Sequence, residues 1–296
     1  MSELIECIDG LTAENILKRA AKTANGVPFY INTLGLGGWC DEYQTIYDYM
    51  VTLGSPPSSA VADAQNTMLC GLVDAGIWAT RDLFYLFAQE FNTAMEARFN
   101  WKNPGTHNIG LVNAPTWTSL EGYQGNGTNS YLRTYWTPNT HGVNYLQNDA
   151  NAAWYVRNNT VGAHYDFGCN DAGQTKVLYG GSRYTGDVAR VQVNDQGVHS
   201  VANTDSRGMW FVNRPDAANH EMYRNKVRII NQAQASTGRS TKELYICVRN
   251  SNGTPAQYSD KQISVFSIGA KLAQSDIDTF TDLVEGYMDA VGKGVI

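Results

Sequence analysis

The chain of 296 residues is poor in charged side chains, which make up 17% of the sequence against roughly a quarter in typical soluble proteins. Uncharged polar residues take their place, with 26 asparagines and 28 glycines against 22 lysines and arginines together. Such a composition disfavours long helices and favours turns. Hydrophobic residues still make up 43%, which excludes a disordered chain. The net charge of −6 argues against a nucleic-acid-binding protein.

Signals for export and for membrane insertion are missing too. The N-terminus reads MSELIECIDG, which is acidic and lacks the apolar segment of a secretory signal peptide. The longest uncharged run, from Thr23 to Cys40, contains a proline and four glycines, so no membrane insertion is expected. The five cysteines are an odd number without a CxxC pair, which predicts free buried thiols in a reducing cytoplasm. They are Cys7, Cys40, Cys70, Cys169 and Cys247.

Motifs for nucleotide binding, serine hydrolysis and zinc proteolysis are absent from the sequence. A glycosidase needs two carboxyl groups a few ångströms apart, whereas the only glutamates between residues 101 and 272, Glu121, Glu221 and Glu243, are isolated from one another. We therefore expect no catalytic residue, no metal site and no cofactor. Scattered aspartates leave Ca²⁺ as the one ion to consider, although no loop is densely acidic.

Charge divides the chain into modules. Residues 1–100 carry a net charge of −7 and residues 101–272 a net charge of +5, and 20 of the 26 asparagines follow residue 100. The first part predicts helices: one opened by Thr12, one from Asp41 to Gly54, and a helical lead over 59–100 that starts after Ser58. In that lead, apolar side chains recur at three- and four-residue steps, namely Leu69, Leu72, Val73, Ile77, Leu83, Phe84, Phe87 and Phe91.

Residues 101–272 show short runs of β-branched and aromatic residues separated by Gly, Asn and Asp clusters. This pattern predicts an antiparallel β-sandwich. A C-terminal helix over 273–296, capped by Ser275, is expected to pack back on the rest. The expected class is therefore α+β, mainly β, with an N-terminal arm over 1–58 ahead of the helical lead. The strand candidates are 131–136, 152–157, 176–180, 188–193, 209–214, 226–230, 244–249 and 262–267.

Aromatic residues of the sandwich suggest a place for a sugar ring to stack. The candidate ligand-binding residues are Trp136, Trp154 and Tyr155 with the nearby amide of Asn158. Burial of the same rings in the sandwich is the alternative. Trp210 is assigned to the core, because it lies in the apolar run Met209–Val212.

Three segments, 179–183, 208–229 and 243–272, resemble laminin-G-like, concanavalin-type jelly rolls. The tail from Phe266-Ser-Ile-Gly269 to Gly292-Lys293 fits the same pattern, and Lys226 departs from it by replacing the usual hairpin glycine. Over residues 60–296 the chain is similar to virion proteins of tailed bacteriophages, in particular crAss-like phages of Bacteroidetes hosts.

The resemblance implies a non-enzymatic structural protein of the virion, such as a tail fibre, head fibre or decoration protein. Its lectin-like sandwich would bind host-surface glycans or neighbouring subunits, and its partners would be other virion proteins and further copies of itself. A cellular carbohydrate-binding adhesin or lectin is the first alternative. A polysaccharide-cleaving jelly-roll enzyme is the second.

The N-terminal arm contains an uncharged stretch, 27–39, without strong periodicity. We expect its large apolar side chains to be buried in an interface with another subunit. The alternative is a strap across the protein's own sandwich. The candidate interface residues are Phe29, Tyr30, Leu34, Leu36 and Trp39.

Overall fold

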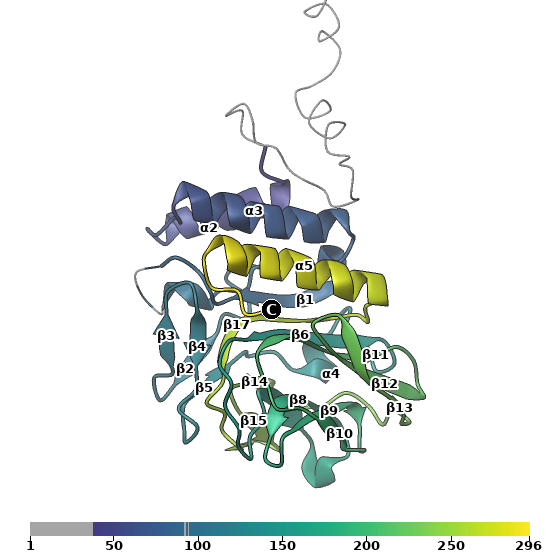
Figure 1. Ribbon diagram of the computed structural model, residues 1–296. Coiled ribbons are helices and arrows are strands. Elements are labelled where there is room, and N and C mark those ends of the chain that lie inside the picture. Colours follow the sequence, from purple (N-terminus) through teal and green to yellow (C-terminus); the bar gives the residue numbers. More distant parts are fainter. Residues whose placement is uncertain (1–37, 92, 94) are drawn as a thin grey trace, which may run out of the picture.

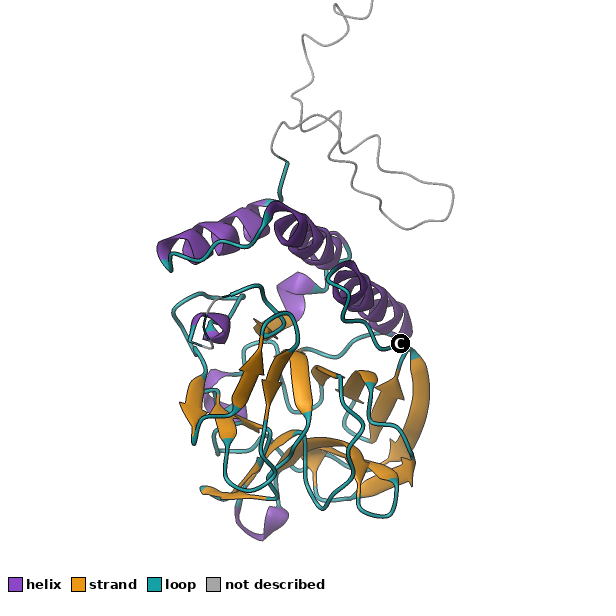
Figure 2. Cartoon of the chain, turned by 60° about the vertical axis from the view of Figure 1, so that its left-hand side comes forward, coloured by secondary structure: helices purple, strands orange, loops and turns teal. Residues whose placement is uncertain are grey.

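The computed structural model describes residues 38–91, 93 and 95–296. Two β-sheets lie face to face, and a layer of helices covers one of them (Figures 1 and 2). The helices are α2 (Asp41–Thr52), α3 (Ser59–Asp74), the one-turn α4 (Pro138–His141) and α5 (Gln274–Ala290). The expected β-sandwich with helices before it and a helix at its end is therefore confirmed.

The first sheet runs in the order β13-β12-β11-β6-β17-β4-β3, and β1 also pairs with β17. All its pairs are antiparallel. Its strands are β1 (Arg81–Leu86), β3 (Thr116–Thr118), β4 (Gly122–Gln124), β6 (Ala150–Val156), β11 (Gly208–Arg214), β12 (Asn219–Arg224), β13 (Val227–Ala233) and β17 (Gln262–Gly269).

The second sheet runs in the order β10-β9-β8-β7-β14-β5-β2, and β15 joins it as a parallel partner of β7. Its strands are β2 (Gly110–Val112), β5 (Tyr131–Arg133), β7 (Phe167–Asn170), β8 (Val177–Tyr184), β9 (Val188–Asp195), β10 (His199–Ala202), β14 (Tyr245–Ile246), β15 (Arg249–Ser251) and β16 (Thr254–Ala256), the last paired with β15.

The two inner faces meet in an aromatic core. Trp154 of β6 packs edge-on against Phe167 of β7, with ring centroids 5.0 Å apart, and stacks on Trp210 of β11 at 6.0 Å. Phe266 of β17 contacts Phe167 from the other side at 5.0 Å. Trp210 is fully buried and its indole N–H donates to the Ser206 carbonyl at 2.8 Å, which confirms its assignment to the core.

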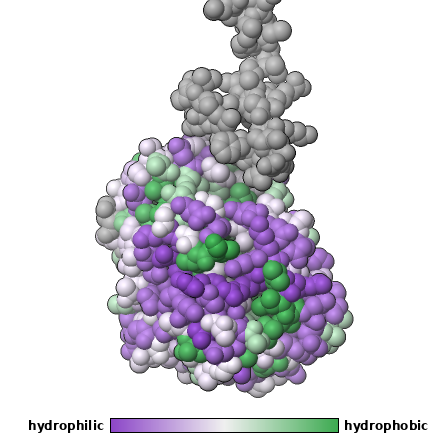
Figure 3. Space-filling model, in the orientation of Figure 1, coloured by the Kyte–Doolittle hydropathy of each residue, from purple (hydrophilic) through white to green (hydrophobic). Residues whose placement is uncertain are grey.

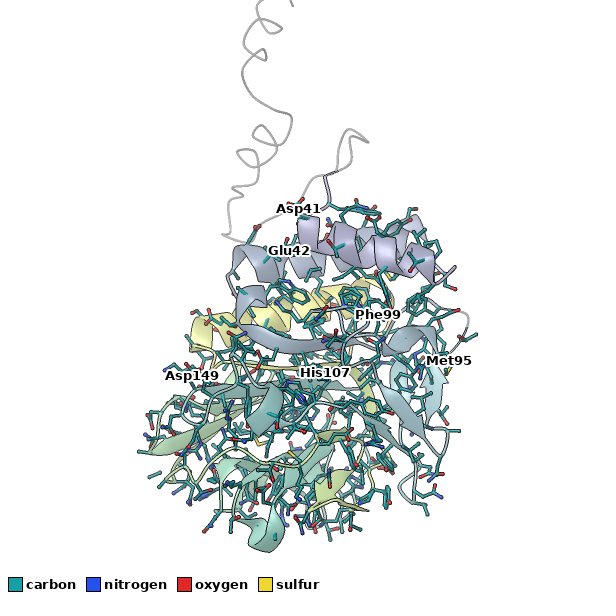
Figure 4. The ribbon with its side chains drawn as sticks, turned by 180° about the vertical axis from the view of Figure 1, so that it is seen from behind. Asp41, Glu42, Met95, Phe99, His107 and Asp149 are labelled. Carbon is teal, nitrogen blue, oxygen red and sulfur yellow. A yellow bond between two sulfur atoms is a disulfide. The ribbon has the colours of Figure 1, made fainter. Side chains whose placement is uncertain are left out.

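The outer face of the first sheet is covered by α5, on which α3 packs (Figure 2). Phe280 of α5 contacts Phe84 of β1 and Phe211 of β11, with centroids 6.1 and 5.5 Å apart. Gly71 lets α3 approach α5, because a Cβ at this position would lie 2.4 Å from Leu283 Cδ2. Phe99 fills the space beneath α2, stacked on Trp101 at 6.2 Å and next to Tyr49 at 5.0 Å (Figure 4).

The helical lead is shorter than the apolar spacing predicted. Helix α3 ends at Asp74, and Arg81–Leu86 is a strand whose residues pair with β17, Phe84 opposite Ser267. Leu83 and Phe84 therefore belong to the sheet, and the helical interpretation of residues 81–86 is wrong. An apolar run that is buried on both faces has apolar residues at three- and four-residue steps whether it forms a helix or a strand. Here the pairing with β17 shows that it forms a strand.

Two local expectations also change. The hairpin between β12 and β13 forms with Asn225 at φ 47° and Lys226 at φ 72°, so lysine occupies the left-handed position where the family pattern has glycine. Helix α5 starts at Gln274, and the Ala273 N–H donates to the Asp276 carboxylate at 3.0 Å. The predicted cap, Ser275, thus lies inside the first turn.

Cys40 and Cys70 form a disulfide, which overturns the expectation of free thiols at these two positions. The bond joins the residue before α2 to the last turns of α3, and the Cys40 N–H also donates to Asn66 Oδ1 at 3.3 Å. Sequence spacing did not reveal the pair because the two cysteines meet only when α2 packs on α3. Cys169 and Cys247 are free and buried as expected, and Cys7 lies outside the described residues.

Replacing both Cys40 and Cys70 with serine should lower the free energy of unfolding by about 3 kcal/mol, because the bond closes a loop of 30 residues in the unfolded chain. Thermal unfolding monitored by circular dichroism measures the effect. Dithiothreitol should lower the melting temperature of the wild-type protein and leave that of the double variant unchanged. Equal sensitivity of both proteins to the reductant would contradict the assignment.

Candidate functional site

The predicted aromatic binding residues do not form a surface. Trp136, Trp154 and Tyr155 are at most 1% exposed. Trp154 faces the second sheet, while Tyr155, the next residue of β6, faces α5 and donates its hydroxyl to Glu285 at 2.5 Å. Trp136 packs on Tyr145 in the main core. The rings are therefore structural, and the ligand-binding interpretation of these three residues is wrong.

Asn158 is half-buried, and its side chain joins two segments of the chain. Its Nδ2 donates to the Asp260 carbonyl at 2.8 Å, and its Oδ1 accepts from the Gln262 N–H at 2.7 Å. Both polar atoms are engaged in holding the chain before β17. Asn158 thus positions a strand.

A different set of residues gathers on the outer face of the second sheet, which lies at the end of the molecule away from α3 and α5 (Figure 1). The register places Tyr245, Gly168, Tyr179 and Gln192 in one row across β14, β7, β8 and β9. Tyr179 belongs to a side-chain cluster separate from the main core, whereas its neighbour Leu178 belongs to the core. The row therefore points away from the sandwich interior.

Three tyrosines form the centre of this surface. Tyr165 lies over Tyr179 with ring centroids 3.9 Å apart and contacts Tyr184 at 5.5 Å. Two arginines lie on these rings: the guanidinium carbon of Arg190 is 3.7 Å from the Tyr184 centroid, and that of Arg249 is 5.3 Å from the Tyr165 centroid. We call Tyr165, Tyr179, Tyr184, Arg190, Gln192 and Arg249 the tyrosine–arginine face.

This face holds an unusual share of polar atoms without a hydrogen-bond partner in the described part of the protein. Gln192 is fully buried and neither its Oε1 nor its Nε2 is bonded. The Nε atoms of Arg190 and Arg249 are also buried and unpaired, as is Oε1 of the adjacent Gln257. Leaving a buried donor or acceptor unpaired costs about 1–3 kcal/mol. An ordered water that pairs these atoms would recover that free energy.

A second group of tyrosines lies beside the first on the same sheet. Tyr131 packs on Tyr245 at 4.9 Å, and Arg133 lies over Tyr135 at 4.8 Å. Here the guanidinium is paired, because Nη2 and Nε of Arg133 contact the Glu243 carboxylate at 2.6 and 3.2 Å. The charge of Arg133 in this second group is therefore compensated within the protein.

Glu121, Glu221 and Glu243, the three glutamates considered for a hydrolase, each bind a different set of side chains. Glu243 holds Arg133, and Glu121 holds both Arg157 at 2.9 Å and Lys293 at 2.6 Å. Glu221 accepts from three side chains, namely Arg228 at 2.9 Å, Tyr223 at 2.8 Å and Asn213 at 3.0 Å.

Glu221 lines an open groove of about 670 Å³ in which it is the one carboxylate. Burial, followed by the bond to Glu221, raises the pKa of Tyr223 to about 12, so its hydroxyl stays protonated. The groove therefore lacks the second carboxyl group of a two-carboxylate glycosidase.

Among the described residues, no group of three or more metal-ligating side chains converges, and no helix is long and apolar enough to cross a membrane. Of the predicted interface residues, Phe29, Tyr30, Leu34 and Leu36 lie outside the described residues. Trp39 is half-buried against α2, with its ring 5.1 Å from Tyr43 and 4.4 Å from Tyr47.

No protein-family model and no curated protein sequence matches the chain. Among solved structures, Trypanosoma rangeli sialidase in complex with sialic acid is similar at 12% identity and a TM-score of 0.48, over 69% of this chain and 33% of that one. The binding domain of botulinum neurotoxin DC in complex with rat synaptotagmin II is similar at 11% identity and a TM-score of 0.49, over 70% of this chain and 52% of that one. The chain thus spans a third to a half of these proteins, and matches of this size carry no statement about its activity.

Replacing Glu121 with glutamine should lower the free energy of unfolding at pH 7 by about 1 kcal/mol, because the carboxylate fastens the C-terminal segment to β6. The bond to Lys293, and then the charge of Arg157, lowers the pKa of Glu121 in the folded protein. The contribution is therefore present above the unfolded-state pKa and is lost as the pH falls through the lower folded-state value.

Denaturant unfolding of wild type and Glu121→Gln between pH 7 and pH 3 measures this difference. The two curves should converge at the acid end. Asp63→Asn, at an exposed position of α3, is the control and should change stability little. A difference that persists unchanged at pH 3 would contradict an ionic role for Glu121.

Proposed function

We propose that this protein is a non-enzymatic structural protein that binds carbohydrate through the tyrosine–arginine face. The observation that carries the proposal is the combination of tyrosine rings with unpaired polar atoms on one sheet face. Carbohydrates offer apolar ring faces for aromatic side chains and hydroxyls that donate and accept hydrogen bonds. Tyr184, Arg190 and Arg249 are half-buried and reach solvent, with Tyr179 and Gln192 buried beneath them.

The arrangement of acidic groups favours binding over cleavage. Each of Glu121, Glu221 and Glu243 is paired with at least one basic side chain. An acid catalyst must be free to hold and give up a proton, whereas these three carboxylates are engaged in ion pairs. A polysaccharide-cleaving enzyme is therefore the weaker candidate.

Replacing Tyr184 with alanine should reduce the affinity for a bound glycan about tenfold, because it removes an aromatic ring and the support of Arg190. Tyr184→Phe keeps the ring and should retain most of the affinity. An immobilised-glycan array finds the glycan, and isothermal titration calorimetry measures its dissociation constant.

Tyr135→Ala is the matched control, since Tyr135 is an exposed tyrosine beneath an arginine of the same sheet that lies outside the tyrosine–arginine face. It should bind like wild type. Absence of glycan binding by the wild-type protein, or a loss in Tyr135→Ala equal to that in Tyr184→Ala, would overturn the proposal. Release of sugar from a bound polysaccharide would overturn its non-enzymatic part.

We further propose that the protein is a virion component of a tailed phage, as the resemblance over residues 60–296 implies, and that it assembles with copies of itself or with other virion proteins. The Cys40–Cys70 bond, which joins the start of α2 covalently to α3, supports a role outside the cell. Disulfides persist under oxidising conditions, which a particle meets outside the cell. A cellular adhesin exposed at a surface would meet the same conditions and is the second candidate.

Removing residues 1–37, which leaves Trp39 and Cys40 in place, should convert an oligomer into a monomer if the arm is the assembly element. Sedimentation velocity at micromolar concentration compares the two chains, and circular dichroism checks that both are folded. The full-length chain should sediment as the larger species and be recovered in purified particles. Identical monomeric behaviour of both chains, with the shortened chain still incorporated into particles, would contradict the assembly role.

A further inference from the structure

The arginines of the protein differ in how their charge is compensated. Among the described residues, seven arginines form an ion pair with a carboxylate. Arg81, Arg98 and Arg239 have no such pair, and each donates instead to backbone carbonyls. Arg190 and Arg249 have neither kind of acceptor, and both belong to the tyrosine–arginine face.

Arg190 lies on β9 opposite Gly181 of β8. Its guanidinium group contacts the ring of Tyr184, and its Nε is buried without an acceptor. None of its side-chain N–H groups has a hydrogen-bond acceptor among the described residues. Since a guanidinium stays charged at every physiological pH, this half-buried cation is uncompensated within the described chain.

Arg249 begins β15, opposite Gly168 of β7. Its one hydrogen bond is a long contact of 3.4 Å from Nη1 to the side-chain amide oxygen of Gln174, and its Nε is buried and unpaired. Arg249 lies over Tyr165 and Arg190 over Tyr184, and these two rings are 5.5 Å apart. The two uncompensated cations therefore belong to one cluster.

The planar fork of a guanidinium group matches a carboxylate, which accepts two parallel hydrogen bonds. Arg133 shows this pairing on the same sheet, with both contacts to Glu243 supplied from inside the protein. At Arg190 and Arg249 the chain supplies no such partner. Gln192 and Gln257 add buried amide atoms without a partner beneath and beside them, so the surroundings of the two arginines supply no compensating acceptor either.

We propose that the tyrosine–arginine face selects acidic polysaccharides and that the carboxylates of their sugar residues pair with Arg190 and Arg249. This inference rests on the proposed carbohydrate-binding function and adds the ligand class. Tyr184, the half-buried ring of the three, contacts the sugar, and the two arginines distinguish a charged sugar from a neutral one. Basic charge of the sandwich, +5 over residues 101–272, would favour encounter with a polyanion.

The test compares polygalacturonate with its fully methyl-esterified form, which has the same backbone without the charge. Affinity electrophoresis and isothermal titration calorimetry on the full-length protein measure binding to each. We expect the free acid to bind at least about tenfold more tightly than the ester, since a hydrogen bond to a charged group is stronger than one to a neutral group. The preference should shrink in about 0.5 M NaCl.

Arg190→Gln and Arg249→Gln should each lower the affinity for the free acid much more than the affinity for the ester, and so remove most of the preference. Arg207→Gln is the matched control, because Arg207 is an exposed arginine that pairs with Asp205 at 3.0 Å and does not belong to the tyrosine–arginine face. It should bind both polymers like wild type. Thermal unfolding verifies that all three variants are folded.

The outcomes separate this inference from the proposed function. Equal binding of the acid and the ester, lost together in Tyr184→Ala, would overturn acidic selectivity and leave carbohydrate binding in place. Retained selectivity in both arginine variants would overturn the site. A pair of dextran sulfate and dextran distinguishes sulfate from carboxylate, and a preference for dextran sulfate without one for polygalacturonate would overturn the carboxylate assignment. If the protein binds none of the four polymers, the inference is overturned for these sugars.

Discussion

Burial of the first sheet on both faces is the constraint on which the rest of the structure depends. Consecutive residues of β6 show it, because Trp154 packs into the sandwich while Tyr155 bonds to α5. The strands of the first sheet that lie between α5 and the second sheet therefore have no free face for a ligand, and the open groove beside Glu221 lies towards its β12–β13 edge. The outer surface of the second sheet carries the tyrosine–arginine face.

The helix layer is fastened to the sandwich and to itself at several points. The disulfide joins α2 to α3, Gly71 allows α3 to approach α5, and Glu121 holds Lys293 after the last helix. Helices of this length are marginal alone and gain their stability from packing on an apolar surface. The view in Figure 3 shows hydrophilic residues over most of the surface, with small separate hydrophobic patches, as expected when the large apolar residues are used inside.

The presence or absence of a partner distinguishes the structural charged side chains of this chain from the candidate binding residues. Glu121, Glu221 and Glu243 are isolated from one another in the sequence, and in the structure each is paired with a cationic side chain. Their role is therefore structural. The informative exceptions are two arginines and a buried glutamine without partners. No motif could have revealed them, because Tyr165, Tyr184, Arg190, Gln192 and Arg249 come from a loop and three strands. The one available signal was the strand alternation around Tyr179 and Gln192, which places both on the face opposite Leu178 and Val191.

By itself the sequence determined the architecture: helices around residues 41–54 and after Ser58, a run of short strands beyond residue 100, and a closing amphipathic helix. These follow from local properties, namely the period of apolar residues, turn residues and caps, which act over a few positions. Only the tertiary structure decided that Leu83 and Phe84 lie in a strand, that Cys40 bonds to Cys70, and that Trp136, Trp154 and Tyr155 are core. Each of these depends on which distant segment lies opposite, and an aromatic residue has the same local pattern whether its neighbour is a second sheet or water. The tyrosine–arginine face has the same origin, since it exists only where three strands and a loop are brought together.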